Sequence, residues 1–446
     1  MDLLAKIKEA GVVGCGGAGF PTHVKLNSRP EYFIINGAEC EPMLRTDRYI
    51  MIHLAEKLVA AADLVADTIG AAHEVIAVKA HYEEEIAALK AAIQKLGSRL
   101  EIHPMDSFYP AGDEQVIVYE VTGKVVPAGG IPMDVGAIVD NVATMIAIAD
   151  AAEGKPFTHK YLTVTGEVAH PSVLYVPVGT SYRECIELAG GKLTDHYIVV
   201  SGGPMMGKTM SKEEAEKAVV TKTTSGILVL PDDSAIANHY HTDIRRMLIR
   251  AKTACIQCSF CTQMCPRYLL GHPIEPHKVM RTMAMCTDVK DVLDHPAIRN
   301  AAVCCECGIC EVYACPMGLA PRTINGMLKK ELAAAGIRYQ KEQRVFKTDE
   351  NREYRKAPTD RVAIRAGVKQ YNDYVIKDCK TYEPAEVRIP LQMHIGAPAQ
   401  PVVHEGDYVE KGTLIAVCPE GKLGAGICTG ISGIVHLDKD AVLIRA

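Results

Sequence analysis

The sequence has little of what marks membrane, secreted or nucleic-acid-binding proteins. Its 446 residues contain no apolar run of about 18 residues, the length that spans a bilayer. The first residues, Met1 to Lys8, form a short amphipathic pattern without the long apolar core of a secretory signal. Positive charge is not in excess, since the net charge is −5, and we expect no role in nucleic-acid binding. Tryptophan is absent altogether, which excludes nothing.

Cysteine, by contrast, is abundant. The sequence has 16 cysteines and no sign of export, so we expect the thiols to stay reduced in the cytoplasm and to bind metal. Apolar residues make up 48% of the chain, enough for several hydrophobic cores. The length predicts about three or four domains.

Two cysteine runs with the spacing of iron–sulfur proteins lie between residues 255 and 315. The first is Cys255-x2-Cys258-x2-Cys261-x3-Cys265, followed by proline, which is the bacterial pattern for binding a 4Fe–4S cluster. In this pattern three closely spaced thiolates bind one cluster and the fourth binds its neighbour. We therefore expect two 4Fe–4S clusters. The predicted ligands are Cys255, Cys258, Cys261 and Cys315 for one cluster, and Cys304, Cys307, Cys310 and Cys265 for the other.

The second run departs from the pattern in two ways. Its last spacing is x4 rather than x3, and Cys305 is one cysteine more than a cluster needs. We assign Cys304 as the ligand, because it keeps the i, i+3, i+6 spacing, and leave Cys305 beside the cluster. Zinc sites commonly use two separated Cys-x2-Cys pairs, and disulfides need an oxidising compartment. The doubled runs, each ending in Cys-Pro, favour iron–sulfur clusters over both alternatives.

A glycine-rich stretch near the N-terminus is followed by alternating strands and helices. Five glycines fall between Gly11 and Gly19, where they let backbone N–H groups approach a phosphate, and Lys25 can add a positive charge. The pattern then predicts strands at 31–36 and 74–79 and helices at 47–69 and 83–96. This alternation favours a parallel sheet with ligand-binding loops at the strand ends.

Four motifs, in this order along the chain, carry a resemblance to a known family. They are Gly14-x-Gly16-Gly17-Ala18-Gly19-Phe20-Pro21, Asn36-Gly37-Ala38-Glu39-Cys40-Glu41-Pro42, Tyr109-Pro110-Ala111-Gly112-Asp113-Glu114 and Asp140-Asn141-Val142-Ala143-Thr144. They resemble the flavin-binding subunit family, which includes the 51-kDa subunit of respiratory complex I, the C subunit of the Rnf complex and the PduS-type cobalamin reductases.

The resemblance implies that the N-terminal domain binds FMN without a covalent bond and takes electrons from NADH. Phe20 and Glu41 would face the nicotinamide nucleotide. Ala38 stands where the complex I subunit has an acidic residue, so the nucleotide contacts match less closely than the flavin contacts. The implied cofactor-binding residues are Gly14, Gly16, Gly17, Gly19, Phe20, Lys25, Asn36, Glu39, Glu41, Glu114, Asn141 and Thr144.

The expected fold is a multidomain α/β protein with a β-rich C-terminal end. Short strands separated by glycine turns around His394-Ile395-Gly396-Ala397-Pro398 indicate a barrel-sandwich module, and its position at the end resembles the PduS type rather than the Rnf type. The expected units are a Rossmann-like FMN and NADH domain at 1–155, a β-grasp (soluble-ligand-binding) module at 156–235, a helical ferredoxin-like unit with two 4Fe–4S clusters at 236–338, a linker or surface-wrapping segment at 339–383, and the barrel-sandwich domain at 384–446.

These parts together predict an electron-transfer enzyme that needs no general acid or base. NADH delivers two electrons at once, an iron–sulfur cluster accepts one, and a flavin can connect the two because it takes a pair and releases single electrons. The resemblance implies cobalamin as the acceptor, reduced toward cob(I)alamin, with a corrinoid adenosyltransferase and the shell proteins of a diol-degrading bacterial microcompartment as partners. Two alternatives remain open: an Rnf C-like NADH dehydrogenase module that serves ferredoxin or a partner complex, and a non-enzymatic electron relay or scaffold.

Overall fold

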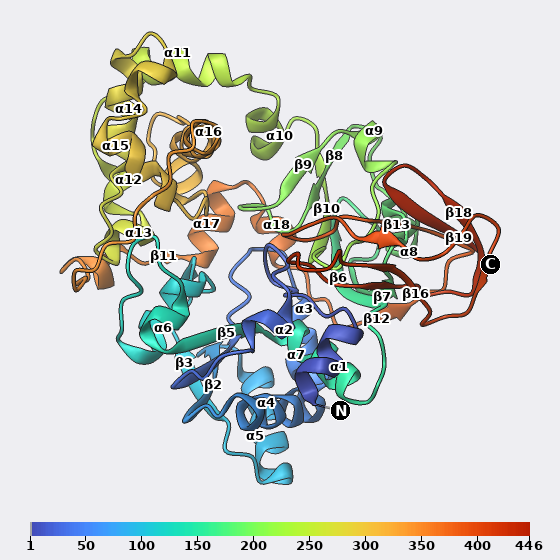
Figure 1. Cartoon of the computed structure of the whole chain (residues 1–446). Helices are drawn as coiled ribbons and strands as arrows, with labels where there is room; N and C mark the ends of the chain where they lie inside the picture. The colour runs from blue at the N-terminus through green and yellow to red at the C-terminus, as the bar shows by residue number, and fades with distance from the viewer. Residues whose placement is uncertain (1) are drawn as a thin grey trace.

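The chain forms four packed units, which a computed structural model describes for residues 2–446 (Figure 1). An N-terminal α/β unit is followed by a unit built on a mixed sheet, by a helical cysteine-rich unit and by a C-terminal β unit. The multidomain α/β architecture expected from the sequence is therefore confirmed. No helix within residues 2–446 has both the length and the apolar character needed to cross a membrane.

The N-terminal unit is a parallel sheet in the order β3-β2-β1-β5 with helices on both faces. Phe33 and Ile35 of β1 pack with α1, α4 and α7, whereas Ile34 faces α6, as expected of a sheet buried on both sides. Its elements are α1 (Leu3–Glu9), α2 (Thr22–Lys25), β1 (Tyr32–Gly37), α3 (Thr46–His53), α4 (Ala55–Ile69), β2 (His73–Lys79), α5 (Glu83–Leu96), β3 (Glu101–Met105), β4 (Phe108–Tyr109), α6 (Glu114–Thr122), η1 (Pro132–Val135), β5 (Ala137–Asn141) and α7 (Val142–Ala152).

The single helix predicted for residues 47–69 is two helices in the structure. The backbone leaves the helical region at Leu54, with φ −123° and ψ 23°, so that α3 ends there and α4 begins. The start of α3 is fixed by the next unit, because Thr46 and Thr163 share a side-chain hydrogen bond of 2.8 Å and Thr163 also accepts from the N–H of Arg45. A contact between units thus lies at the start of α3, and the change in backbone conformation at Leu54 ends it.

The second unit is a mixed sheet in the order β12-β7-β6-β10-β8-β9. Its outer strand β12 pairs in parallel with β7 and comes from the segment after the cysteine-rich unit. The segment 339–383 therefore wraps back over the molecule and completes this sheet. The elements of the sheet unit are β6 (His159–Gly166), β7 (Ser172–Pro177), α8 (Tyr182–Leu188), β8 (Tyr197–Ser201), β9 (Lys208–Met210), α9 (Lys212–Ala215), β10 (Gly226–Pro231) and β12 (Cys379–Thr381).

The cysteine-rich unit is helical and packs around α11, α14 and α16. Helices lie directly before Cys255 and shortly after Cys315, in agreement with the helical unit expected at 236–338. Its elements are α10 (Ala235–Tyr240), α11 (Ile244–Ala254), α12 (Phe260–Gln263), α13 (Pro266–Leu269), α14 (Pro276–Met285), η2 (Val289–Val292), α15 (Pro296–Arg299), η3 (Asn300–Val303), η4 (Ile309–Tyr313) and α16 (Pro321–Ala334).

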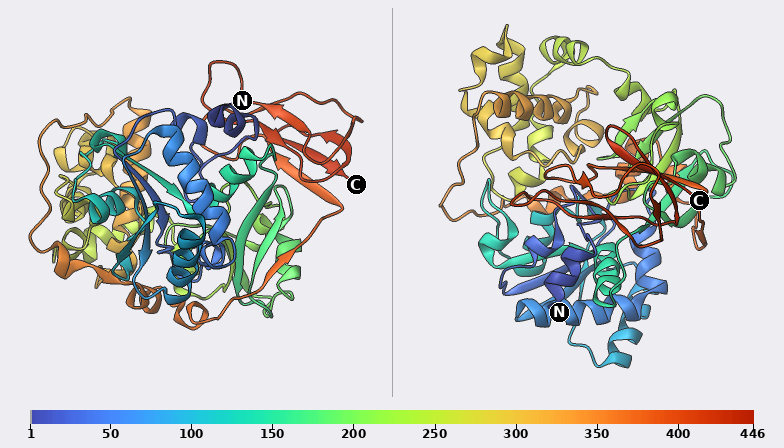
Figure 2. Two further views of the ribbon diagram at one scale, coloured as in Figure 1. Left: turned by 90° about the horizontal axis from the view of Figure 1, so that it is seen from below. Right: turned by 45° about the vertical axis from the view of Figure 1, so that its right-hand side comes forward.

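The C-terminal β unit consists of two small sheets that enclose one core, in the orders β13-β19-β18-β15 and β14-β16-β17. Figure 2 shows this unit beside the second unit and close to the N-terminal helix. The elements of the wrapping segment and of this unit are η5 (Arg352–Arg355), β11 (Ala357–Pro358), α17 (Thr359–Arg365), α18 (Lys369–Asn372), β13 (Glu386–Pro390), β14 (Gln400–Pro401), β15 (Tyr408–Val409), β16 (Leu414–Val417), β17 (Ile427–Cys428), β18 (Gly433–Leu437) and β19 (Ala441–Arg445).

Candidate functional site

The glycine loop and the ends of β1 and β5 meet at one edge of the parallel sheet. Asn36 and Asn141 are register partners at these strand ends. Gly16 lies so close to Asn141 that a Cβ atom at position 16 would be 2.9 Å from the Cβ of Asn141. The loop is closed by the N–H of Gly14, which donates to the carbonyl of Phe20 at 3.0 Å, and Phe20 itself is 38% exposed. These predicted site residues therefore gather at the carboxyl edge, where parallel sheets bind ligands.

Lys25 lies at this edge, on the short helix α2 that follows the loop. Its ammonium group is 2.9 Å from Glu114 and 3.5 Å from Asp140, and it also donates to the carbonyl of Val139. Burial disfavours the charge on Lys25, but Asp140 and Glu114 outweigh burial and raise its pKa. Lys25 is therefore a fixed cation. One carboxylate oxygen of Asp140, Oδ2, is buried without a hydrogen-bond partner in the described part of the chain.

The acidic turn after β1 is bound to the N-terminus of α3. The carboxylate of Glu39 accepts the N–H groups of Asp47 at 2.8 Å and Arg48 at 3.4 Å, and burial raises its pKa. Burial, together with the charge of Glu39, raises the pKa of Asp47 to about 7. Asp47 in turn accepts a hydrogen bond of 2.7 Å from the amide of Asn141. The two strand ends are thus connected by half-buried polar groups.

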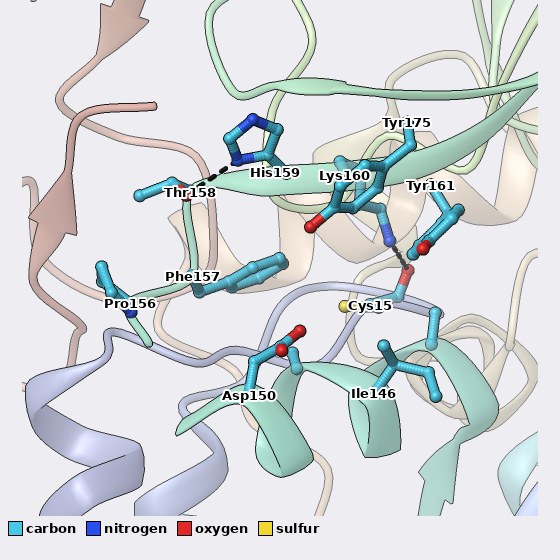
Figure 3. Close-up of a pocket in the computed structure, with 12 residues that line it drawn as sticks. Cys15, Ile146, Asp150, Pro156, Phe157, Thr158, His159, Lys160, Tyr161 and Tyr175 are labelled. Carbon is cyan, nitrogen blue, oxygen red and sulfur yellow. Dashed lines mark hydrogen bonds between the residues drawn. The ribbon is translucent and has the colours of Figure 1, made fainter. Parts of the chain in front are cut away.

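The glycine loop is also held from behind, by α7 and β6. The hydroxyl of Thr144 accepts the N–H of Cys15 at 2.9 Å. The buried Lys160 donates to the carbonyl of Cys15 at 3.4 Å, as Figure 3 shows. Neither Lys160 nor Asp47 was predicted from the sequence. For Asp47 the sequence held a signal, because it is an acidic residue in the first turn of the helix that follows the acidic turn. No sequence pattern pointed to Lys160, since it belongs to a different unit of the chain.

These residues suit a flavin with a phosphate. Gly17 has no atom within 4 Å of where its Cβ would lie, so the loop leaves open space at this residue, and Lys25 on the helix that follows supplies a fixed cation. A glycine-rich loop with free N–H groups and a cation is the usual donor set for a phosphate. The side chain of Asn36 already makes two hydrogen bonds within the protein. Its amide nitrogen donates to the carbonyl of Gly112 at 2.9 Å, and its amide oxygen accepts the N–H of Ala38.

Four cysteines line one small cavity in the cysteine-rich unit. They are Cys255, Cys258 and Cys261 of the first run and Cys315 of the second. The N–H of Leu319 donates to the sulfur of Cys315 at 3.3 Å, and the amide of Gln257 donates to Cys255 at 3.1 Å, the kind of contact that tunes a cluster thiolate. Within residues 2–446 no three His, Cys, Asp or Glu side chains converge on a point where a single metal ion would bind. A 4Fe–4S cluster has four irons, and its ligands surround it.

A second group of cysteines surrounds Cys265 and consists of Cys304, Cys305, Cys307 and Cys310. Burial raises the pKa of Cys265, and the adjacent thiols of Cys304 and Cys305 raise it further. A hydrogen bond that Cys307 donates to Cys305, together with burial and the neighbouring Cys310 and Cys265, raises the pKa of Cys307. The structure therefore brings together the second predicted set of ligands, with Cys305 beside them. Such protons must leave when thiolates bind iron.

The two cysteine loops have positive φ angles at matching positions. In the first loop the residues two and four after Cys255, Gln257 and Ser259, have positive φ angles of 55° and 61°. In the second loop the residues two and four after Cys304 are Glu306 and Gly308, with φ angles of 56° and 80°. The positive φ angles therefore fall at the same positions of both loops when Cys304, rather than Cys305, is aligned with Cys255.

The x4 spacing also has a structural explanation. After the first loop the chain forms an α-helical turn, α12, and reaches Cys265 after three residues. After the second loop it forms a π-helical turn, η4, which takes up one more residue before Cys315. A π turn is wider than an α turn by one residue. The longer spacing is thus absorbed in the turn, and Cys315 still reaches the cavity of the first loop.

Glu41 lies where three units meet. Its carboxyl group accepts from the hydroxyl of Tyr109 at 3.2 Å and from the N–H of Met205 in the second unit at 2.9 Å. Tyr109 also donates to the carbonyl of Cys307 at 2.7 Å. Burial raises the pKa of Glu41 to about 7. Tyr109 therefore connects the strand ends of the sheet to the second cysteine group. In the sequence, only its place in the Tyr109–Glu114 motif pointed to this residue.

The C-terminal β unit contacts the glycine loop. The N–H of Ile395 donates to the carbonyl of Ala18 at 3.0 Å. Gly19 has a φ angle of 73°, and a Cβ atom there would be 2.6 Å from the Cβ of His394. The His394–Pro398 motif is therefore packed on the loop that precedes Lys25.

Comparison with known proteins assigns a family to each unit. Residues 7–150 match the Nuo51 FMN-binding domain, 161–209 the SLBB domain, 254–320 the 4Fe–4S dicluster domain, and 365–442 the RnfC barrel sandwich hybrid domain. Cobalamin reductase PduS of Citrobacter freundii is 39% identical over 432 residues, which cover 96% of this chain and 93% of that protein. The chain belongs to the PduS cobalamin reductase family.

Other relatives show which parts are shared more widely. Cobalamin reductase PduS of Salmonella typhimurium is 40% identical over 97% of this chain and 94% of its own. The C subunit of the Na(+)-translocating ferredoxin:NAD(+) oxidoreductase complex of Acetobacterium woodii is 37% identical, but over only 59% of this chain and 57% of its own. Family membership and the matched domains make the chain a flavin and iron–sulfur oxidoreductase, which removes the non-enzymatic alternative.

Proposed function

We propose that the chain transfers electrons from NADH, through FMN and two 4Fe–4S clusters, to cobalamin. When bound, FMN would accept two electrons as a hydride and release them singly, and the clusters would carry single electrons. The cobalamin step is supported by the two PduS relatives, which match nearly the whole chain. The NADH step is supported by the Nuo51-type domain and by the ferredoxin:NAD(+) oxidoreductase relatives.

The observation that carries this proposal is the contact through Tyr109. Its hydroxyl group donates both to Glu41, in the acidic turn after β1, and to the carbonyl of Cys307. A second contact joins the same units, because Arg267, two residues after Cys265, forms a 2.9 Å ion pair with Asp113. The proposed flavin edge and the second cysteine group are therefore neighbours, as electron transfer between them requires.

For FMN, the proposed binding residues lie on the glycine loop and at the edge of the sheet. The N–H groups of the loop and Lys25 would hold the phosphate, while the strand ends would contact the rest of the flavin. Phe20, partly exposed at the end of the loop, is proposed to face the nicotinamide. Glu41 belongs to the same proposal, and its bonds to Tyr109 and Met205 indicate that it would act by positioning. The full set is Gly14, Gly16, Gly17, Gly19, Phe20, Lys25, Asn36, Glu39, Glu41, Glu114, Asn141 and Thr144.

For the clusters, we propose the exchanged pairing of the two runs. Cys255, Cys258, Cys261 and Cys315 would bind the outer cluster, and Cys304, Cys307, Cys310 and Cys265 the cluster next to the flavin edge. The matching φ angles of the two loops support Cys304 over Cys305. A corrinoid adenosyltransferase and microcompartment shell proteins are proposed partners, on the strength of the PduS relatives alone.

The test follows the order of electron flow. In the anaerobic, washed enzyme, NADH should bleach the flavin absorbance before the cluster absorbance falls. Cys258→Ser should leave NADH oxidation by an artificial dye largely intact, because the dye takes electrons from the flavin. The same variant should lose most cobalamin reduction, whereas Cys286→Ser, a cysteine outside both groups, should lose none. Rapid reduction of ferredoxin without any reduction of cobalamin would replace this proposal by the Rnf C-like function, which the partial matches to ferredoxin:NAD(+) oxidoreductases favour.

A further inference from the structure

A large cavity lies between the second unit and the cysteine-rich unit. It is next to the outer cysteine group, which consists of Cys255, Cys258, Cys261 and Cys315. Its volume is about 930 Å³, within the range of small-molecule sites. It is bounded by β9 on one side and by α10, α11, α16 and α17 on the others, which Figure 1 shows facing one another. Cys315, a proposed ligand of the outer cluster, forms part of its wall. The proposed FMN edge contacts the second cysteine group instead, through Tyr109.

The rim of this cavity is positively charged. Lys208, Arg250, Lys330 and Arg365 line it, all are exposed, and none has an ion-pair partner within residues 2–446. The one carboxylate in the wall, Glu311, is buried and already bound to Arg322 at 2.7 Å. The cavity therefore presents unneutralised cations and polar groups to a ligand.

A second cavity, of about 530 Å³, borders Cys304 and Cys305 but has a different charge. There Arg267 is paired with Asp113 at 2.9 Å, and Lys329 with Glu306 at 2.6 Å. Arg338 is the cation of its wall without an ion pair in the described chain. The two cavities thus differ in size and in the number of free cations, and only the larger one touches the outer cysteine group.

From these contrasts we infer that the larger cavity binds the corrinoid acceptor, an inference that rests on the proposed function. Cobalamin is a large amide-rich ring that carries one anionic group, the phosphodiester of its nucleotide loop. The free cations would bind this phosphodiester, and the ring would lie toward Cys315. Reduction of cob(II)alamin to cob(I)alamin adds one electron to cobalt. That electron comes from NADH through the cofactors and leaves from the cluster that Cys315 would help to bind.

Direct binding to the full-length protein tests the inference without relying on turnover. Cyanocobalamin binding is measured by equilibrium dialysis for the wild type and for the double variant Arg250→Glu/Lys330→Glu. We expect the double variant to bind about tenfold more weakly, since two charge reversals act on one anion. Arg338→Glu, an exposed cation at the smaller cavity, is the matched control and should bind as the wild type does.

A second ligand isolates the phosphodiester. Cyanocobinamide lacks the nucleotide loop, so its binding should change less than about twofold in the double variant, because no anion faces the rim. Equal losses for both ligands, or an equal loss in Arg338→Glu, would overturn the assignment. If the wild type reduces cobalamin and the double variant binds it unchanged, the cavity assignment fails while the proposed function stands. If the wild type oxidises NADH with a dye but neither binds nor reduces cobalamin, the proposed acceptor fails as well.

Discussion

At the scale of single residues, the choice between Cys304 and Cys305 is open to a direct experiment. Cys304→Ala should lower the iron content from about eight to about four atoms per chain, because one 4Fe–4S cluster loses a ligand. Cys305→Ala should keep about eight, since that thiol only neighbours the ligands. Iron and sulfide assays with electron paramagnetic resonance measure the outcome, and Cys286→Ala is the control. The reverse pattern would make Cys305 the ligand.

Lys25 provides the second prediction at this scale. Its charge is held by Asp140 and Glu114, so Lys25→Ala removes the fixed cation and should weaken FMN binding by about tenfold or more. Acid-released FMN per chain measures the effect, and Lys25→Arg should retain part of it. Lys57→Ala removes another ion-paired lysine of the same unit, paired with Asp150, and should leave the FMN content unchanged. Full FMN occupancy in Lys25→Ala would exclude Lys25 from the site.

The part of the site that can be predicted from the sequence is the part whose residues lie close together in the chain. The cysteine spacing identifies the 4Fe–4S dicluster domain, because ligands on one loop are close in sequence and in space. Gly308 also favours Cys304 as the ligand from the sequence alone. A glycine four residues after Cys304 suits the positive φ angle that this position of the loop has. Lys160 and Tyr109 could not be assigned, because their partners lie 145 and 198 residues away in the chain.

At the scale of elements, the glycine loop and the His394–Pro398 motif depend on each other. Gly19→Ala adds a methyl group 2.6 Å from the Cβ of His394, in addition to the backbone strain of a positive φ angle. Gly70→Ala has the same strain, with a φ angle of 67°, but no neighbour within 4 Å, and should cost only about 1–2 kcal/mol. We expect Gly19→Ala to lower the melting temperature further and to release FMN. Equal effects of the two variants would show that the contact does not matter for the loop.

Elements whose partners are nearby in sequence were predicted well, and others were not. The alternation of strands and helices predicted the parallel sheet, because each strand packs on the helix that follows it. The break at Leu54 was not predicted, because the apolar pattern runs through it and neither proline nor glycine marks it. Strand β12 was not predicted either, since an edge strand of three residues has too few side chains to produce a pattern.

At the scale of the whole molecule, Glu41 couples three units and has a distinct pH dependence. Its pKa is about 7 in the folded chain, against a usual value of 4.5, so the folded state holds a proton that the unfolded state has lost. The contribution of Glu41 to stability is therefore full below about pH 4.5 and is lost as the pH rises toward 7. Glutamine cannot ionise, so the stability of Glu41→Gln should not fall in this way as the pH rises. Unfolding midpoints of both proteins at pH 5 and pH 8 measure the difference.

The expected result is that Glu41→Gln gains stability relative to the wild type at pH 8 and not at pH 5. Glu56→Gln, an exposed carboxyl group paired with Lys95, is the control and should show no such change. A larger gain at pH 5 would contradict the burial of Glu41. The identity of the units followed from sequence motifs, whereas this junction did not, because sequence motifs describe each unit alone and not the surfaces by which units meet.

The π turn at η4 has a consequence for how such chains change length. An insertion into a rigid helix normally rotates every later residue by about 100°, which would carry Cys315 away from its cavity. Here the added residue is taken up within one widened turn, so the residues before and after it keep their places. Insertions and deletions at this point are therefore compatible with an unchanged set of ligands. What the protein must preserve is the position of each sulfur atom, and the two runs reach it with spacings that differ by one residue.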